Sequence, residues 1–334
     1  MKIIHIGNIA NVSYLLCHGL TTEYNIDTML AVKDEPINFP FIYSKNNNPY
    51  QVNFFVFKTQ RDYFNLLSEA LTADILQFHG RIKAKQLPLE LLHPRKIRHF
   101  HGSDIRNQSW RKNILLKTGS SIVREKVLIS TFDLVNSWND AQYLPNPVDP
   151  IFFKAFSSQD DYSIFLPARF ENQTKGIQFA FEAWDRIKRL NKEVKLKVIC
   201  WGEDLEYYRV KYKNDERIKW IQTLNQSQMA IEMVNSSIIW GQFKIMSLVG
   251  LIELEAMALA KVVMMKFEEP KIAEYKPPIC NVNTPKDLAQ KTLQLLGDEG
   301  RRNRIGQQAQ EWVKKNHSLK NVTRKLVDIY NNLI

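Results

Sequence analysis

Short apolar runs alternate with amphipathic segments along the whole chain. The first apolar run covers residues 2–6, a turn follows at 7–12, and 13–20 has helical spacing before 24–30 approaches a second strand. Strand, glycine turn, helix and strand in this order form a βαβ unit, which requires a parallel sheet covered by helices. The pattern therefore predicts an α/β fold from the first residues onward.

The alternation continues on both sides of one stiff segment, 144–149. Before it, strands are expected at 52–57, 74–78, 95–100 and 126–130, and helices at 63–71, 87–92 and 106–116. After it, strands are expected at 164–169, 196–200, 218–220, 237–240 and 262–265, and helices at 177–190, 226–234, about 251–260, from 285 onward, 300–315 and 319–333. In the helix 63–71, the apolar positions are Phe64, Leu67 and Leu71.

Residues 144–149, Leu-Pro-Asn-Pro-Val-Asp, combine turn-forming residues with two prolines of fixed φ. Since 334 residues are also many for one core, we expect two domains with the hinge here. The predicted domains are 1–148 and 149–317, followed by a terminal helix, 318–334, that packs back on the first domain.

Composition narrows the class of protein. Hydrophobic residues make up 44% and charged residues 24%, which is ordinary for a soluble globular protein. The chain opens on a strand rather than a signal peptide, and no segment approaches the ~20 apolar residues of a membrane span. Cys17, Cys200 and Cys280 have neither metal-ligand nor redox spacing. We therefore expect a cytoplasmic protein.

The formal charge of +11 is concentrated in one window, Arg81–Lys126, which holds twelve Lys or Arg against three acidic residues. Such a surface attracts phosphate-rich partners. No recognised nucleic-acid motif accompanies the charge, so nucleic acid is disfavoured. We expect an anionic membrane surface, with the protein peripheral on its inner face, or a charged acceptor. The alternative is a solvated surface of scattered charge.

The stretch Trp240–Val263 is the strongest candidate site. It begins as the end of a strand, crosses a loop containing Ser247 and closing at Gly250, and enters a helix with Glu255 about one turn in. A helix start offers N–H groups and positive dipole charge to phosphate, and a carboxylate behind it can accept two hydrogen bonds from a ribose diol. The alternative is a buried amphipathic helix of any α/β protein.

Two further polar clusters follow predicted strands. His101-Gly102-Ser103-Asp104 comes after 95–100, and the carboxyl ends of such strands line the binding crevice of α/β sheets. We expect His101 in the site, with a satisfied core histidine as the alternative, and a capping or orienting role for Asp104. Arg169 and Lys175 flank a loop at a helix start, where both can reach one diphosphate. Gly202, after another strand, is expected to let the backbone pass close to ligand.

The motifs, taken in order, resemble the family-4 retaining glycosyltransferases over nearly the whole chain. They are Gly7-Asn8, His-Gly-Ser-Asp at 101–104, Pro-Asn-Pro-Val-Asp at 145–149, Arg-x5-Lys-Gly at 169–176 and Glu-Ala-Met-Ala at 255–258. The resemblance implies the GT-B fold, two doubly wound Rossmann-like domains facing a central cleft. It departs at one place. Glu255 matches the second glutamate of the family's Glu-x7-Glu motif, but Ser247 stands at the first, which puts that contact to the donor sugar in doubt.

The resemblance implies a hexosyltransferase that moves sugar, with retention, from a UDP- or GDP-sugar to a glycan, lipid-linked or other cell-surface polysaccharide acceptor. It assigns catalytic roles to His101, which faces the sugar, and to Arg169 and Lys175, which hold the diphosphate. It assigns donor-binding roles to Gly7, Asn8, Gly202, Ser247, Gly250 and Glu255, the last as the ribose ligand. We expect no metal and no cofactor, because no Asp-x-Asp motif occurs and the fold requires none.

The same sequence features bear on three alternative functions. The absence of Gly-x-Gly-x-x-Gly disfavours a dinucleotide dehydrogenase. A GT-B sugar-nucleotide epimerase or hydrolase would turn over donor without acceptor. A catalytically degenerate, glycan-binding member would explain Ser247 and would bind donor without turnover, or not at all. The donor base, the sugar, the acceptor, the linkage and the oligomeric state are not specified by these residues.

Overall fold

The computed structural model describes residues 1–34, 42–81, 89, 91, 93–106, 118, 125–138, 140–157, 160–244, 249–268 and 275–334. The chain divides into two compact units. One comprises Met1–Pro147 with His317–Ile334, and the other comprises Val148–Asn316.

The described strands of the first unit form one parallel sheet in the order β3-β2-β1-β4-β5-β6-β7. Their bounds are β1 Lys2–Ile6, β2 Asp27–Lys33, β3 Phe54–Phe57, β4 Ile75–His79, β5 Lys96–Phe100, β6 Lys126–Ile129 and β7 Gln142–Tyr143. The order reverses direction between β1 and β4. In a doubly wound sheet, the crevice outside the carboxyl ends of the strands at such a point is the usual ligand site.

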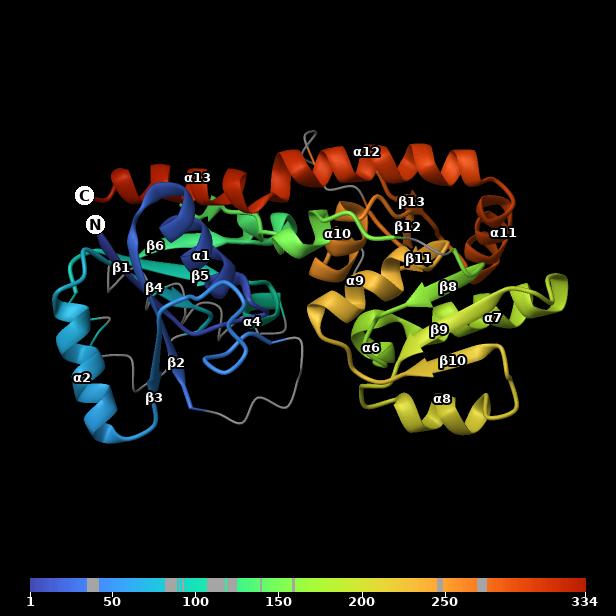
Figure 1. Ribbon diagram of the computed structural model, residues 1–334, viewed down its shortest axis with the longest axis horizontal. Coiled ribbons are helices and arrows are strands. Elements are labelled where there is room, and N and C mark those ends of the chain that lie inside the picture. The colour runs from blue at the N-terminus through green and yellow to red at the C-terminus, as the bar shows by residue number, and fades with distance from the viewer. Residues whose placement is uncertain are drawn as a thin grey trace. The chain divides into compact units, whose positions relative to one another are not determined.

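Helices cover both faces of this sheet. They are α1 Val12–Tyr24, α2 Gln60–Leu71, α4 Ser103–Arg106 and α13 Leu319–Asn331, with a 3₁₀ helix at Phe132–Ser137. In Figure 1, α13 runs alongside α1, and the two helices are in contact. Gly19 allows this approach, because a Cβ there would lie 2.5 Å from Thr323 Cγ2.

Helix α2 packs on the opposite face and corrects one sequence expectation. Its buried residues are Leu66 and Ala70, whereas Phe64 and Leu71 are 68% and 66% exposed. The spacing 64, 67 and 71 therefore identified the helix but not its inward face. Isolated apolar side chains are common on protein surfaces, so they do not by themselves define a core face.

The second unit contains a six-stranded parallel sheet among its described residues, in the order β10-β9-β8-β11-β12-β13. The bounds are β8 Ser163–Leu166, β9 Lys195–Ile199, β10 Ile218–Ile221, β11 Ile238–Trp240, β12 Val263–Met265 and β13 Cys280–Asn281. The order reverses between β8 and β11. Since β8 ends at Leu166, Arg169 lies in the following loop and not at the strand end that the sequence suggested.

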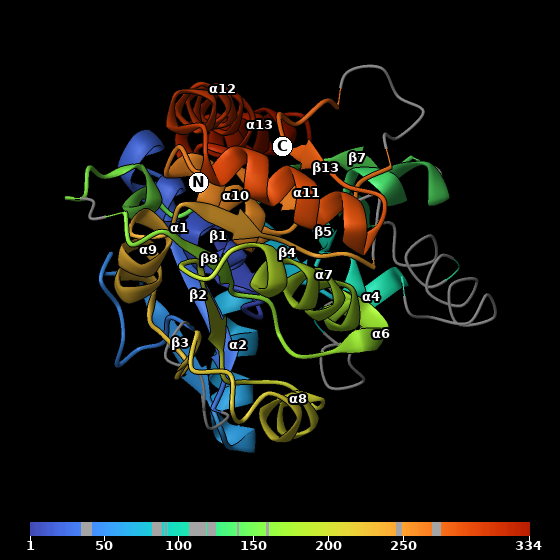
Figure 2. The same cartoon turned by 90° about the vertical axis from the view of Figure 1, so that its right-hand side faces the viewer.

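The helices of the second unit are α6 Asn172–Lys175, α7 Ile177–Leu190, α8 Leu205–Lys211, α9 Gln226–Val234, α10 Leu251–Ala258, α11 Pro285–Leu296 and α12 Glu299–His317, with a 3₁₀ helix at Pro150–Phe153. Helices α7 and α11 lie side by side over one face of the sheet (Figure 2). The indole of Trp240 is buried in this core and donates a hydrogen bond to Thr292 Oγ1 at 3.2 Å, which ties β11 to α11.

The two parallel sheets covered by helices confirm the predicted α/β class. Among the described helices, none is long and apolar enough to cross a membrane.

Candidate functional site

Two loops of the second unit meet at the carboxyl ends of β8 and β11. Lys175 Nζ, in the loop after β8, donates to Gln242 Oε1 at 3.3 Å, and Phe243 N donates to Lys175 O at 2.9 Å. Gly176 adopts φ +69°, and a Cβ there would lie 3.0 Å from Phe243 C. Glycine at 176 therefore lets the loops approach closely and fixes the Lys175 ammonium beside the loop that leads to α10.

Arg169 lies in the same loop after β8. Its Nε is 2.5 Å from Glu171 Oε1, and its Nη2 donates to Glu171 Oε2 at 2.7 Å. The guanidinium also lies over the Trp201 ring, 5.4 Å from the ring centroid. The side chain is 40% exposed, so it is held from two sides and is still accessible to a ligand. Sequence reasoning missed Glu171, although its spacing of two from Arg169 was visible.

Helix α10 brings two buried carboxyl groups into this region. Glu253, in its first turn, accepts a hydrogen bond from Gln242 N at 2.9 Å. A Cβ on Gly250 would lie 2.5 Å from Glu253 Oε2, and a Cβ on Gly241 would lie 2.8 Å from Glu253 Oε1. The two glycines therefore leave room for the Glu253 side chain, a residue that sequence reasoning did not single out.

Glu255 lies one turn into α10 and is buried. Burial, together with the nearby charges of Asp149 and Glu253, raises its pKa well above the usual value of a glutamate. A ligand that offers hydroxyl donors to this carboxyl group would stabilise its charged form. The environment is thus suited to a diol rather than to another anion.

Gly202, after β9, adopts φ +120°, and a Cβ there would lie 2.5 Å from both Phe170 N and Phe170 O. Asp204 N donates to Phe170 O at 3.0 Å, which holds the turn in place. The close backbone approach that requires glycine is therefore to Phe170. The contact of Gly202 with a donor stays a prediction.

In the first unit, Gly7 and Asn8 form the loop after β1. Gly7 has φ +94°, and a Cβ there would lie 3.3 Å from His79 O at the end of β4. Ser13 Oγ donates to Gly7 O at 2.7 Å and lies 3.1 Å from Asn8 Oδ1. Asn8 Nδ2 donates to Tyr43 O at 3.3 Å. This loop is at the point where the strand order reverses.

His101 follows β5 at the same edge of the sheet. Its backbone N–H donates to both carboxylate oxygens of Asp104, at 3.0 and 3.1 Å, so Asp104 orients the chain at His101. Its Nε2 is 2.9 Å from His79 Nδ1, and its Nδ1 is 3.1 Å from Ser130 Oγ and 3.4 Å from Asn146 Oδ1. Burial lowers the pKa of His101, although the Asp104 charge and the Asn146 hydrogen bond oppose the shift.

Two further histidines adjoin His101 and were not predicted. Each of His79, His99 and His101 offers a ring nitrogen within 4.8 Å of the other two. Among the described residues, this group is close enough together to be considered for a metal ion. Desolvation by burial holds the pKa of His79 and of His99 well below the usual range. Their signal was in the sequence, because polar residues alternate with apolar ones at 77 and 79 and again at 99 and 101.

Several predictions fall wholly or partly on residues outside the described ranges. The helices expected at 87–92 and 106–116 lie mostly there, and Ser247 lies there too, so these stay predictions. Another is the basic window Arg81–Lys126, which is only partly described and is less available than its charge count suggested. Lys96 and Arg98 are buried in β5, and Arg98 Nη2 pairs with Glu125 Oε1 at 2.7 Å. Association with an anionic membrane stays a prediction.

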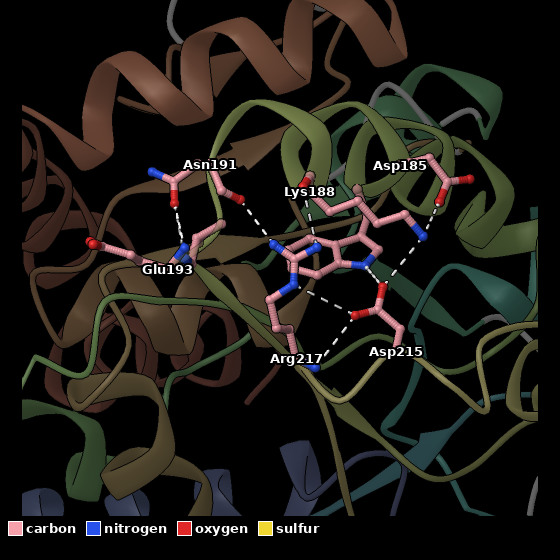
Figure 3. Close-up of polar contacts among 8 residues, drawn as sticks. Asp185, Lys188, Asn191, Glu193, Asp215 and Arg217 are labelled. Carbon is pink, nitrogen blue, oxygen red and sulfur yellow. Dashed lines mark hydrogen bonds and ion pairs between the residues drawn. The ribbon is translucent and has the colours of Figure 1, made fainter.

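A hollow of about 540 Å³ lies elsewhere on the second unit, where the chain enters β10. Figure 3 shows Asp215 there, between Lys188 and Arg217. Arg217 Nη1 donates to Asn191 O at 2.9 Å and Nη2 to Lys188 O at 3.3 Å, at the end of α7. The Arg217 guanidinium thus satisfies the last carbonyl groups of helix α7, next to the amino end of strand β10. This hollow is not part of the candidate site.

The structure groups the candidate residues within each unit. Arg169, Lys175, Gly202, Gly250 and Glu255 follow strands of the second unit or begin its helix α10. Gly7, Asn8 and His101 follow strands of the first unit. The cationic side chains of the former set and the imidazole of the latter therefore follow strands of different sheets.

Comparisons with known proteins concern the family and the fold. Residues 148–312 match the family model of the glycosyl transferases group 1. No curated protein matches the sequence. Among solved structures, the chain is similar to Anabaena Alr3699/HepE in complex with UDP and glucose, at 12% identity over 100% of both chains with a TM-score of 0.72.

It is also similar to a glycosyltransferase from Rickettsia africae, at 15% identity over 99% of this chain and 98% of that chain with a TM-score of 0.70. A third similar structure is the sucrose-phosphate synthase from Thermosynechococcus elongatus, at 11% identity over 100% of this chain and 99% of that chain with a TM-score of 0.67. At such identities the likeness shows the fold, and it confirms the predicted GT-B class.

Proposed function

Residues 148–312 make this chain a member of the glycosyl transferases group 1 family, and we propose that it transfers a sugar from a nucleoside-diphosphate sugar with retention of the anomeric configuration. The observation that carries the proposal is the meeting of the loops after β8 and β11, where the Lys175 ammonium lies 3.3 Å from Gln242 Oε1 next to the segment that leads to α10. Cationic side chains and helix N–H groups gathered at strand carboxyl ends favour a diphosphate.

Arg169 and Lys175 are the proposed diphosphate ligands. The phosphate that leaves the sugar gains negative charge in the transition state, and cations fixed in advance stabilise that charge without reorganisation. Glu171 and Trp201 hold the Arg169 guanidinium, and Gln242 holds the Lys175 ammonium, which supports such preorganisation.

Glu255 is the proposed ribose ligand. Its carboxyl group is buried near Asp149 and Glu253, and two hydroxyl donors would satisfy it without adding negative charge. Gly250, whose lack of a side chain leaves space for Glu253, begins the helix whose N–H groups would face phosphate or sugar. Gly202 and Ser247, which lies outside the described residues, are donor-site residues by proposal.

His101, Gly7 and Asn8 are proposed to contact the sugar from the first unit. We name no protein nucleophile. In the proposed reaction the bond from the anomeric carbon to the leaving phosphate oxygen breaks, the acceptor oxygen bonds to the same face of that carbon, and the acceptor proton passes to the leaving phosphate. The reaction needs no metal in this scheme, because Arg169 and Lys175 supply the positive charge.

The proposed donor is UDP-glucose, and the proposed acceptor is a glycan, a lipid-linked sugar or another cell-surface polysaccharide. The similar Anabaena structures are complexes with UDP and glucose and with UDP-glucose. UDP-glucose is therefore the first donor to test. GDP-sugars are the second set.

The test is turnover. Wild-type protein is incubated with UDP-glucose or a GDP-sugar and a mixture of glycan acceptors, and the released nucleoside diphosphate is measured. Proton NMR of the product reports the anomeric configuration. Arg169→Ala should lose about 100-fold or more in kcat, whereas Arg186→Ala, on the exposed surface of α7, should behave as wild type. An inverted product would refute retention, and turnover that is unchanged in Arg169→Ala would refute the site.

A further inference from the structure

One buried polar network of the first unit joins His101 to six side chains that have no part in the chemistry proposed above. Its side chains come from β1, β4 and β5, from the residues that follow β5 and β6, and from α13. The members are Tyr330, Gln77, His99, Ser130, His101, His79 and His5. The strand register explains the grouping, because His5 pairs with Gln77 and His79 with His99, and residues two apart on a strand share a face.

The hydrogen-bond contacts within this network form a closed ring. Tyr330 Oη lies 2.6 Å from Gln77 Oε1, and Gln77 Nε2 lies 3.2 Å from His99 Nδ1. Ser130 Oγ lies 2.8 Å from His99 Nε2 and 3.1 Å from His101 Nδ1. His79 Nδ1 lies 2.9 Å from His101 Nε2, His79 Nε2 lies 2.9 Å from His5 Nδ1, and His5 Nε2 lies 3.3 Å from Tyr330 Oη. Each side chain therefore has one neighbour on either side.

The direction of the ring is set at Gln77. Its carboxamide oxygen accepts from the Tyr330 hydroxyl, so its Nε2 donates to His99 Nδ1. A neutral imidazole has one donor and one acceptor nitrogen, so His99 carries its proton on Nε2 and donates to Ser130 Oγ.

The same rule runs back from Tyr330 through the remaining members. The Tyr330 hydroxyl gives its proton to Gln77, so His5 Nε2 donates to the Tyr330 oxygen. His5 Nδ1 is then bare and accepts from His79 Nε2, and His79 Nδ1 is bare and accepts from His101 Nε2. His101 Nδ1 is bare in turn and accepts from Ser130 Oγ at 3.1 Å, so in this tautomer it gives no proton to Asn146 Oδ1 at 3.4 Å, and the Ser130 proton is not given to Phe100 O. Every hydrogen bond of the ring then holds one proton.

We propose that this closed ring is a positioning device that holds His101 neutral, in a single tautomer with Nδ1 bare and Nε2 protonated, and that Tyr330 of the C-terminal helix closes it. An additional proton on His5, His79 or His99 would place two donors face to face in one hydrogen bond, and one on His101 Nδ1 would require the Ser130 hydroxyl to turn to Phe100 O. The role in positioning a sugar contact rests on the proposed function, but the ring itself does not. The other six members act through His101 and need not touch a ligand.

The surroundings agree with a neutral ring. Burial lowers the pKa of all four histidines, to about 3 for His5. Charged groups near the ring are Asp104, which favours a cation at His101, and Arg98, which disfavours one at His79. Desolvation exceeds the Asp104 charge, so the shift at His101 is downward.

A metal ion is the competing occupant of this cluster. Two ligand nitrogens of a tetrahedral zinc ion, each about 2.0–2.1 Å from the metal, stand about 3.3 Å apart. The 2.9 Å between His101 Nε2 and His79 Nδ1 is instead the usual length of an N–H···N contact with a shared proton. The geometry therefore favours protons over a metal.

Opening the ring at Tyr330 gives a directional prediction. Tyr330→Phe leaves His5 Nε2–H buried without its acceptor, which is unfavourable. The protons of His5, His79 and His101 can then shift together to Nδ1, because His101 Nδ1–H finds an acceptor in Asn146 Oδ1. We expect these three histidines to reverse tautomer in the variant.

The experiment is two-dimensional NMR of the full chain with ¹⁵N-labelled histidine at pH 7.5, which distinguishes protonated from bare ring nitrogens. Wild type should show protonated Nε2 at all four histidines, and Tyr330→Phe should show protonated Nδ1 at three. Tyr14→Phe is the matched control, since Tyr14 is buried and its hydroxyl bonds Asn48 Oδ1 outside the ring. If Tyr330→Phe fails to fold, Ser130→Ala opens the ring elsewhere and should move the proton of His101 to Nδ1.

A histidine cation or protonated Nδ1 in wild type would overturn the ring, and so would signals that do not change in the opened variants. Stoichiometric binding of added Zn²⁺ with joint shifts of His79, His99 and His101 would replace it with a metal site. In turnover assays, Tyr330→Phe should lower kcat about five- to tenfold at unchanged donor KM. An active variant with reversed tautomers would retain the ring but reject its positioning role.

Discussion

Acidification should reduce the stability contributed by the buried histidines of this protein before most carboxylates titrate. His5 and His317 are buried, and burial lowers their pKa to about 3 and about 4, from 6.5 in the unfolded chain. As the pH falls below 6.5, the unfolded chain therefore takes up protons that the folded chain does not, and stability decreases with pH. The stability contributed by each neutral histidine is fully present above 6.5 and is lost as the pH falls toward its folded pKa.

The magnitude follows from linkage. Between pH 7.5 and 5.5, each of these two histidines removes about 1.4 kcal/mol from the free energy of unfolding, about 3 kcal/mol together. His79, His99 and His101 change in the same direction, whereas Glu255, whose pKa burial raises, changes in the opposite direction. The total is large beside a typical stability of about 5–15 kcal/mol.

The assay is urea denaturation followed by circular dichroism at pH 7.5, 6.5 and 5.5. His317→Gln should reduce the pH dependence by about 1.4 kcal/mol over this range, because it removes one of the two groups. A pH dependence that is the same in His317→Gln as in wild type would refute the reasoning and mean that His317 is charged or solvated in the folded protein.

Other predictions concern a close helix contact and the proposed metal-free reaction. Gly306→Ala should destabilise the second unit by roughly 3 kcal/mol or prevent folding, since its Cβ would lie 1.8 Å from Ala260 O. Gly300→Ala lies in the same helix α12, but there the nearest atoms to an added Cβ are 3.7 Å away, so it should be neutral or stabilising by up to about 1 kcal/mol. Thermal denaturation of both variants and of wild type measures these effects. Chelation by EDTA should leave donor turnover unchanged, and activity that is lost to EDTA and restored by Mg²⁺ or Mn²⁺ would contradict the metal-free scheme.

Local patterns predicted most of the described strands and helices, but neither helix α8 nor the buried side of α2. Strands such as β1 and β9 were recognised because their apolar runs and turns are determined within a few residues. The buried face of α2 depends on which of its side chains pack against the sheet. The apolar residues Phe64 and Leu71 were therefore expected to face inward, but they are exposed. Charge counting along Arg81–Lys126 has a related limit, since it includes Arg98, which is paired with Glu125 in the interior.

The candidate site was predictable only where a motif names a residue. The resemblance pointed to Arg169, Lys175 and Glu255, but their partners Glu171, Gln242 and Glu253 depend on loop geometry that no single motif contains. The histidine ring depends on the register of β1, β4 and β5 and on Tyr330, 253 positions from Gln77 along the chain. The polar alternation at Gln77 and His79 was visible, but its meaning required the sheet.

The most direct test of the account is the binding of nucleoside diphosphates, measured by isothermal titration calorimetry with UDP, GDP and ADP. Wild type should bind one of them, and Lys291→Ala should bind it equally, because that lysine pairs with Asp287 and donates to Asn281 O away from the loops after β8 and β11. Lys175→Ala should bind it at least about tenfold more weakly, as expected for the loss of a charged hydrogen bond. Equal affinity of Lys175→Ala and wild type would contradict the diphosphate site on which the proposed function depends.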